Sequence, residues 1–490
     1  MRRGPGDACL TVCAAALLAG CAVGPAYHRP AVAEPARWSG AAAQAAFDPA
    51  SNPAATLGHW WRQFHDAELD HLVQTALTDN LDIESAAARI AQARAERDVA
   101  AGAAWPTLAA SVKDQRYRVP DDLQRLPQQL QSAAPGAVTA LTVPRYLSVY
   151  QLGFDTSWEL DLFGATRRSV ESANASAQAA VAARRGVVVA TLAELGNDYL
   201  TLRATQARLR IVRHTLDTEQ LLLELTQSRQ RSGLASELDV AQAQAQLETT
   251  RATPPMLRAQ VLQSIHALAV LLGRPPEDLE QELSADRPLP ESPPAIPVGL
   301  PSELLENRPD IQQAERALAA ATAAVGVARA QRFPSLSLTG GSSLVSTQLN
   351  ELVKHASWTW NLGGSLTAPL FEGGRLAANE RAAAAAAEQS RLLYRQTVLQ
   401  AFRETEDALQ SYAAALERTQ ALQSAAQAQQ VELDRATQTY RAGLDSYIDV
   451  LDADRGVAAA QDQLELGRQQ QLSALVAIYK ALGGGWQEVR

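Results

Sequence analysis

The longest regular pattern of apolar residues in this chain is a seven-residue repeat. Apolar side chains recur at every seventh position at Val188, Leu195, Leu202, Leu209, Leu216 and Leu223. A strict heptad indicates a helix with a coiled-coil seam. The helical pattern around it extends over Thr166–Arg231, and a second pattern of equal length covers Leu376–Arg441. At about 1.5 Å per residue each helix would be about 100 Å long, so we expect an elongated helical protein and not a compact domain.

Two shorter helices precede these long ones. Apolar and alanine positions at helical spacing predict helices over Glu68–Ala104 and Ser302–Arg332, each ending just before an aromatic residue and a proline. Between short and long helix, polar and apolar residues alternate over Gln151–Asp161 and Trp358–Pro369, with shorter partner strands at Leu108–Val112 and Leu336–Leu338. Each half therefore reads helix, strand, strand, long helix, turn, helix.

The alternating strands predict a membrane β-barrel with one face toward lipid and one toward a watery lumen. A soluble sheet with one wet face is the alternative interpretation. Four strands cannot close a barrel around a lumen, and open strand edges are not tolerated in lipid. Several chains would therefore contribute strands to one barrel. Three chains would give twelve strands, although the sequence does not fix that number.

The chain also repeats itself. RSGLASELDV at Arg231–Val240 returns as RAGLDSYIDV at Arg441–Val450, an offset of 210 residues (441 − 231) with six identities in ten. The beginnings of the halves match at an offset of 228, so the first half carries 18 extra residues (228 − 210), which we assign to a longer surface loop. We expect a first repeat over residues 68–286, a proline-rich linker over 287–301, a second repeat over 302–485 and a tail over 486–490.

The N-terminus resembles a secretory leader. Basic residues precede a short apolar run that ends in Leu17-Leu18-Ala19-Gly20-Cys21, which resembles the signal for lipidation of a cysteine. We expect a signal peptide over residues 1–20, acyl chains on Cys21 and a lipidated, proline-rich tether over 21–67. An ordinary signal peptide with an incidental cysteine is the alternative.

Composition and charge further limit the kinds of function that the chain could have. Aromatic residues make up only 5% of the chain and alanine is frequent, which favours helices in close contact. The formal net charge of −9 argues against a nucleic-acid partner. All three cysteines lie within the first 21 residues, the histidines lack metal-binding spacing, and the glycine pairs lack the context of phosphate loops. We expect no enzyme, no metal and no cofactor.

Four motifs together resemble the outer membrane factors, the TolC-like family, and more closely its lipidated branch found with RND efflux pumps. They are GPAYHRP from Gly24, WWRQF from Trp60, WELDLFG from Trp158 and YRAGL from Tyr440. The resemblance covers essentially all of the mature chain. It implies a mainly α fold, in which a homotrimer combines a long antiparallel α-helical barrel with a shared twelve-stranded β-barrel. It also implies a periplasmic adaptor and an inner-membrane RND-type transporter as partners, in an outer-membrane channel of a tripartite efflux system. By analogy with the family, Ala22 after the cysteine fits retention in outer-membrane lipid. The resemblance also implies a helical extension into the periplasm.

The repeated turn is the candidate site. Gly233 and Gly443 are expected at positive φ, with Ser236 and Ser446 capping the returning helices and Asp239 and Asp449 as capping-box partners. The resemblance places adaptor contacts on both turns, at Arg231, Gly233, Leu234, Ser236, Arg441, Gly443, Leu444 and Ser446. It places a closed gate on the second half, at Tyr440, Ile448, Asp449, Asp452 and Arg455. Asp449, Asp452 and Arg455 share one helix face by spacing. Because Gln242 and Ala245 stand at the first-half positions of Asp452 and Arg455, the halves differ where a gate needs asymmetry.

Two other classes remain as alternatives. A periplasmic adaptor lipoprotein would need a lipoyl-like β-domain beside a single helical hairpin, and a coiled-coil scaffold lipoprotein would not need detergent for extraction. The sequence does not identify the cargo of a duct.

Overall fold

The computed structural model describes residues 22–32, 38, 57–124, 144–292 and 306–488. Cys21 and the leader lie outside the described residues, as do most of the predicted tether and linker and the last two residues of the tail. The helices in chain order are α4 (Ala67–Asp79), α5 (Leu81–Gly102), α7 (Ala165–Arg231), α8 (Glu237–Arg251), α9 (Thr253–Leu271), α10 (Glu280–Leu283), α12 (Pro309–Ala330), α13 (Arg375–Arg441) and α14 (Tyr447–Ala481). The strands are β1 (Thr107–Arg118), β2 (Tyr146–Leu160), β3 (Ser335–Ser346) and β4 (Trp358–Thr367).

The chain divides into two compact units. One holds the sheet, with Ala93–Ala177 and Ala317–Ser390 as its main segments, and the other holds Arg29–Gln92, Gln178–Arg316 and Arg391–Arg490. The long helices α7 and α13 contribute residues to both units. Each helix has 67 residues, within one residue of the predicted bounds at its start and ending at the predicted arginine.

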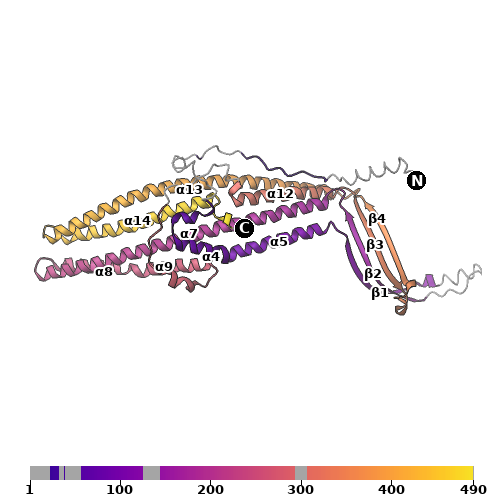
Figure 1. Cartoon of the computed structure of the whole chain (residues 1–490), viewed down its shortest axis with the longest axis horizontal. Helices are drawn as coiled ribbons and strands as arrows, with labels where there is room; N and C mark the ends of the chain where they lie inside the picture. Colours follow the sequence, from indigo (N-terminus) through magenta and orange to yellow (C-terminus); the bar gives the residue numbers. More distant parts are fainter. Residues whose placement is uncertain (1–21, 33–37, 39–56, 125–143, 293–305, 489–490) are drawn as a thin grey trace, which may run out of the picture. The chain divides into compact units, whose positions relative to one another are not determined.

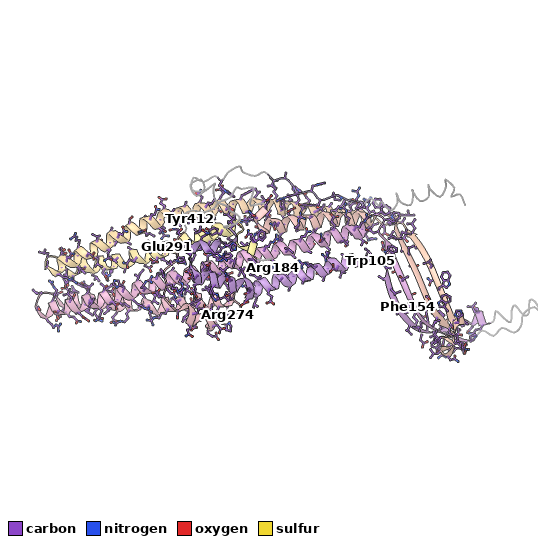
Figure 2. The ribbon with its side chains drawn as sticks, viewed as in Figure 1. Trp105, Phe154, Arg184, Arg274, Glu291 and Tyr412 are labelled. Atoms are coloured by element: carbon purple, nitrogen blue, oxygen red, sulfur yellow. The ribbon has the colours of Figure 1, made fainter. Side chains whose placement is uncertain are left out.

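The sheet unit is a four-stranded antiparallel sheet in the order β1-β2-β3-β4. Its register separates the side chains by polarity. One face carries the apolar set Leu108, Val112, Leu152, Phe154, Trp158, Leu336, Leu338, Leu344, Trp358, Trp360, Leu362 and Leu366. The opposite face carries the polar set Thr107, Ser111, Lys113, Gln151, Asp155, Ser157, Glu159, Ser337, Thr339, Ser343, Thr359, Asn361 and Ser365. Phe154, labelled in Figure 2, projects from β2 with 59% of its surface exposed.

Strands β1, β2 and β3 are longer than predicted: β1 extends beyond Leu108–Val112 to Arg118, and β2 begins at Tyr146 and not at Gln151. For β3 the glycines of the sheet explain the difference. We expected only Leu336–Leu338 as the first strand of the second hairpin, because Gly340 and Gly341 indicate a turn. The strand instead continues to Ser346. A Cβ on Gly341 would lie 2.5 Å from the Asn361 side chain, and one on Gly153 would lie 2.3 Å from Ser343. These glycines therefore serve close packing across the strands, a use that local sequence does not distinguish from a turn.

The segment after residue 21 is held against the sheet unit. The Val23 backbone N–H donates to the Phe163 carbonyl at 3.1 Å. A Cβ on Gly24, where φ is +103°, would lie 2.5 Å from the Gly326 Cα. The Arg168 guanidinium donates to the carbonyls of Val23 and Gly24. The part of the predicted tether that the structure describes here is therefore a packed strap.

The helical unit buries the heptad seam, as predicted. Val188, Leu195 and Leu202 have no exposed surface, and Leu209 and Leu223 are nearly buried. Near the end of α7, residues of α7, α8, α13 and α14 share one apolar cluster. Figure 1 shows α8 folding back beside α7, and α14 beside α13.

A larger core lies further along α7. Trp60, which is 1% exposed, stacks on Tyr479 at 5.4 Å between ring centroids and makes edge contacts with Trp61 and Phe64. A Cβ on Gly196 would lie 2.9 Å from the Trp60 ring, so the helix has room for no side chain there. The WWRQF motif is therefore a core element of this unit.

Three helix boundaries differ from the sequence prediction. The first helix is not continuous, because Asn80 interrupts it. The Asn80 side chain accepts from the N–H groups of Asp82 and Ile83 and donates to the Leu271 carbonyl at 2.8 Å, so it caps the new helix while joining it to α9. The helix expected from Ser302 begins at Pro309, a residue suited to the first helical position. The returning helix of the first half breaks between α8 and α9, where Thr253 is followed by two prolines, while α14 is unbroken.

Within the described residues, no individual helix has both the length and the apolar composition needed to cross a membrane. The bent pair Glu237–Leu271 with Pro276–Leu283 meets those criteria only when the two parts are taken together.

Candidate functional site

The two helix turns have the predicted geometry. Gly233 and Gly443 adopt φ of +73° and +76°. In each turn the following leucine donates its N–H back into the long helix, Leu234 to the Arg229 carbonyl at 2.8 Å and Leu444 to the Thr439 carbonyl at 3.0 Å. This pattern closes a helix with a left-handed glycine and leaves the leucine outside.

The returning helices begin with capping boxes, which confirms that part of the prediction. In the first turn the Asp239 N–H donates to Ser236 Oγ at 3.1 Å, and the Ser236 N–H donates to Asp239 Oδ2 at 2.8 Å. In the second turn the Ser446 N–H and hydroxyl both donate to Asp449 Oδ2, at 3.1 and 2.7 Å. The Asp449 carboxylate is thus engaged by its own turn, which weakens its case as a gate residue.

The tips of both turns are exposed. The eight residues predicted as adaptor contacts are exposed on this chain: Arg231, Gly233, Leu234, Ser236, Arg441, Gly443, Leu444 and Ser446. Leu234 and Leu444 keep 67% and 77% of their surface accessible, and Leu238 and Ile448 extend the apolar surface onto the returning helices. A backbone geometry that repeatedly presents leucine to solvent fits a docking surface.

Tyr440 does not lie on the surface. It is 3% exposed, packs edge to face against Tyr447 at 5.8 Å and lies under the Arg229 guanidinium at 4.4 Å. Arg229 also donates to the Tyr440 carbonyl at 2.8 Å, which joins α7 to α13. The sequence prediction missed Arg229, although its place two residues before the repeated motif could have indicated a role. Burial and, next, the charge of Asp454 raise the pKa of Tyr447 to about 12.

Asp452 and Arg455 lie together on one face of α14, as their spacing predicts. Arg455 Nη1 and Asp452 Oδ1 are 3.9 Å apart, with 54% and 73% of the side chains exposed. The closer partner of Arg455 is Gln246 on α8, whose Oε1 accepts from Nε at 2.7 Å. Arg455 therefore connects the returning helices of the two halves. Gln246 was missed because its partner lies 209 residues away in the chain.

Behind this surface lie two buried carboxyl groups that the sequence prediction also missed. Glu219 on α7 is 3% exposed and Asp454 on α14 is 4% exposed. Glu219 Oε1 accepts from Gln246 Nε2 and Thr250 Oγ1, both at 2.8 Å. Burial, followed by the charge of Glu219, raises the pKa of Asp454 to about 7, while Arg455 opposes the shift. Burial also raises the pKa of Glu219 against the hydrogen bonds it accepts.

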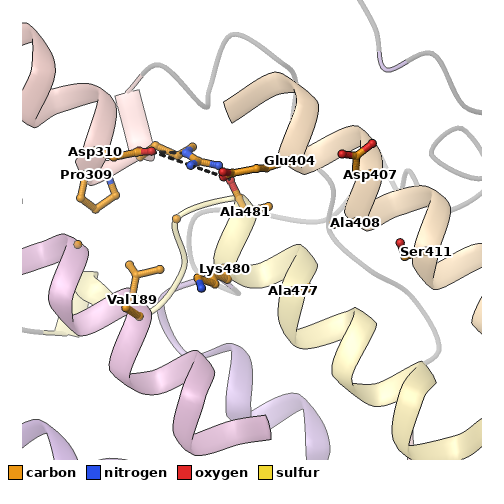
Figure 3. A pocket seen from close by; sticks show the side chains of 14 residues that line it. Val189, Pro309, Asp310, Glu404, Asp407, Ala408, Ser411, Ala477, Lys480 and Ala481 are labelled. Atoms are coloured by element: carbon orange, nitrogen blue, oxygen red, sulfur yellow. Dashed lines mark hydrogen bonds and ion pairs between the residues drawn. The ribbon is translucent and has the colours of Figure 1, made fainter. Parts of the chain in front are cut away.

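A separate cavity of about 500 Å³ lies in the helical unit beside α7, α12, α13 and α14. At its rim Arg308, itself almost buried, pairs with Asp310 and Glu404 at 2.7 Å each and donates to the Ala481 carbonyl. The dashed lines in Figure 3 mark the ion pairs to Asp310 and Glu404, with Lys480 on the opposite side of the pocket. This cluster joins three helices and is a structural crosslink.

Among the residues that the structure describes, no group of three or more His, Cys, Asp or Glu side chains is arranged to hold a metal ion.

Comparison with known proteins agrees with this architecture. The family model described as "Outer membrane efflux protein" matches residues 72–274 and 300–484. The chain is 35% identical over 476 residues to the "Probable efflux pump outer membrane protein TtgC" of Pseudomonas putida, covering 96% of this chain and 94% of the relative. It is 33% identical over 480 residues to the "Pyoverdine export outer membrane protein OpmQ" of Pseudomonas aeruginosa, covering 98% and 97%.

Solved structures show the same fold. The outer-membrane channel OprN superposes with a TM-score of 0.85 at 35% identity, covering 95% of this chain and all of that one. The open-state outer-membrane channel MtrE of Neisseria gonorrhoeae gives 0.80 at 28% identity, covering 95% and 99%.

The two hairpins, the split-polarity sheet and the paired long helices define an outer-membrane channel. The chain belongs to the outer membrane efflux protein family. It is the outer-membrane channel of an efflux system, with the mainly α fold and trimer-shared β-barrel predicted from the sequence, and the adaptor and scaffold alternatives were wrong.

Proposed function

We propose that three copies of this chain form a continuous duct. The polar face of the sheet lines its pore, and the turns at Gly233 and Gly443 form its periplasmic entrance. The observation that carries this proposal is the sheet itself. Most large apolar side chains lie on one of its faces, with most polar side chains on the other, and in the described residues β1 and β4 each pair with one neighbouring strand only. Such edges require strands from other chains in a lipid environment.

The entrance is closed at rest by contacts between the returning helices. Arg455 supports this assignment because it connects α14 to α8 and also lies next to Asp452. Three copies of Asp452 around one axis would repel one another and attract cations. Ile448 adds an exposed apolar side chain near the same end of α14, and Tyr440 braces the base of the turn from within its own chain.

The exposed turn leucines Leu234 and Leu444, with the flanking residues named above, receive a periplasmic adaptor. The adaptor connects the duct to an inner-membrane transporter of the RND type. The names of TtgC and OpmQ support a role in efflux. The cargo is small molecules delivered by the transporter, which sets their selection.

We further propose that acyl chains on Cys21 anchor the protein in the outer membrane. The leader motif supports this, as does the close packing of Ala22 and Val23 against Gly164 and Phe163.

The experiment is reconstitution of the detergent-purified protein into planar bilayers, with light scattering of the same sample. We expect a particle with three times the chain mass and discrete conductance steps that divalent cations block. Neutral replacement of Asp452 should reduce that block. A monomer with an intact β-sheet signal, or a trimer that lacks conductance even after Arg455→Ala, would overturn the proposal.

A further inference from the structure

The two buried carboxyl groups near the second turn lack full pairing. Glu219 on α7 and Asp454 on α14 are each more than nine-tenths buried. Glu219 Oε2 and Asp454 Oδ2 have no hydrogen-bond partner among the described residues. Burial of an unpaired carboxylate is strongly unfavourable, because the charge loses its hydration and gains nothing in return.

Among the described residues, Arg455 is the one cation whose charge acts on both acids. From α8, Gln246 and Thr250 donate to Glu219 Oε1 and leave Oε2 unmatched. On α14, the charge of Arg455 opposes the rise in the pKa of both acids but does not cancel it. Its side chain is half exposed, and its Nε donates to Gln246 and not to either acid.

The aromatic groups facing the pair supply no charge to balance it. Tyr440 from α13 and Tyr447 from α14 are phenols. Arg229 keeps its charge against the Tyr440 ring and carbonyl, but it is not among the charges that shift the pKa of either acid. Two carboxylates and one exposed cation leave the site one positive charge short. The simplest remedy is one proton shared by the pair.

The internal repeat provides a comparison within the same molecule. At the 210-residue offset, Glu219 corresponds to Gln429 and Asp454 corresponds to Gln244. The repeat-related positions thus carry two amides where this site carries two carboxyls. The two amides do not form an equivalent buried pair, because Gln244 is exposed and donates to Glu248 at 2.8 Å. The buried carboxyl pair is therefore a feature of this site and not of the repeat. What acids add is the ability to bind and release a proton.

We infer that Glu219 and Asp454 form a proton-binding site that holds one proton per chain while α14 is packed against α7, and releases it when the two helices separate. This inference rests on the proposed function, in which contacts of α14 help to close the entrance, and it adds that α14 moves away from α7 when the entrance opens. Its ligand is the proton, and its consequence is that opening is linked to proton release.

The direction of the pH dependence follows from the pKa of Asp454 with the helices packed and with the helices separated. With the helices packed, Asp454 keeps its proton up to about pH 7. With the helices separated, water reaches the carboxyl group and its pKa falls to about 4, the ordinary value. Between about pH 4 and pH 7 opening therefore releases one proton per chain. Each unit of pH in that window favours opening about tenfold per chain, or about 1,000-fold if three chains open together. Acid keeps the entrance closed, and the dependence ends above about pH 7.

The direct test is infrared spectroscopy of the purified trimer near pH 6. We expect the carbonyl stretch of a protonated carboxyl group, absent from the E219Q/D454N double variant, in which neutral amides of similar shape replace both carboxyl groups. Glu248→Gln on α8 is the matched control, because Glu248 is half exposed and paired with Arg251. Loss of the band in the double variant but not in the control supports the site. A wild-type spectrum without the band, or a band that the double variant retains, overturns it.

The functional test measures open probability in planar bilayers from pH 5 to pH 8. Wild type and Glu248→Gln should open more readily as pH rises to about 7, and the double variant should show a flat profile at the closed level. Channels that form but keep the wild-type profile in the double variant overturn the link to opening. If no variant, wild type included, forms channels, the proposed function fails, while the infrared result still decides whether the site binds a proton.

Discussion

The bond between Arg455 and Gln246 offers the sharpest test of how the entrance stays closed. It joins α14 of the second half to α8 of the first half within one chain, with Nε and Oε1 2.7 Å apart. Arg455→Ala removes this bond and the weaker contact with Asp452 together. The variant should therefore release the returning helices from each other.

The exposure of the Arg455 side chain limits the free energy that its contact with Gln246 contributes. Because 54% of the Arg455 side chain is accessible, solvent screening limits the contact to about 1 kcal/mol per chain. Three equivalent chains then lose about 3 kcal/mol, which shifts the equilibrium between closed and open by about 150-fold. We expect Arg455→Ala to raise the open probability in planar bilayers by about this factor, with trimers intact.

Arg468→Ala is the matched control. Arg468 lies on the same helix and pairs with Glu465 one turn away, so the same charge is lost without breaking a bond between helices. A double-mutant cycle with Gln246→Ala isolates the contact. Equal opening in the Arg455 and Arg468 variants, or strictly additive effects of the Arg455 and Gln246 changes, would refute the reasoning.

Three further predictions concern the anchor and the backbone. Cys21→Ser should abolish acylation and release protein from the outer-membrane fraction, which mass spectrometry and fractionation would detect; an unchanged mass would exclude lipidation. Gly196→Ala should lower the melting temperature, because its Cβ would meet the Trp60 ring at 2.9 Å, an overpacking that costs about 1–3 kcal/mol; a wild-type melting curve would mean that the ring moves freely. In Gly443→Ala the added Cβ has no atom within 4 Å, but alanine must adopt a φ of +76°. The variant should therefore lose about 1–2 kcal/mol of folding stability through backbone strain alone. Gly443→Asn, which tolerates this conformation better, should lose less, and equal losses would argue against backbone strain.

Patterns local in the chain predicted most of this fold. The heptad and the repeated turn gave both long helices to within one residue, since helical periodicity and a glycine stop depend only on near neighbours. Alternation revealed all four strands but not their full lengths. The first strand was predicted only over Leu108–Val112 and extends to Arg118, β2 begins at Tyr146, before the predicted Gln151, and Gly340 and Gly341 imitated a turn in β3. The break at Asn80 was missed because it depends on the Leu271 carbonyl, which is distant in sequence.

In the candidate site, too, features that depend on near neighbours in the chain could be predicted, and features that depend on distant residues could not. Glycine conformation and serine caps could be predicted, because a turn contains all of its own partners. Tyr440 lies in the core and not on the rim, because Arg229 and Tyr447 enclose it. Glu219 and Asp454 are 235 residues apart (454 − 219), and each would pass for a surface acid until the helices are placed side by side. Whether Ile448, Asp452 and Arg455 control opening stays a prediction.

The strap at Val23 and Gly24 has a consequence for how the molecule sits in a bilayer. Because Ala22 and Val23 pack against Gly164 and Phe163, directly after β2, the lipid proposed on the preceding residue would be attached close to the end of that strand. Its acyl chains would have to enter the bilayer at the level where β2 ends. The anchor would then fix the position of the apolar face of the sheet along the membrane normal, relative to the inner leaflet. A long flexible tether would only keep the protein near the membrane.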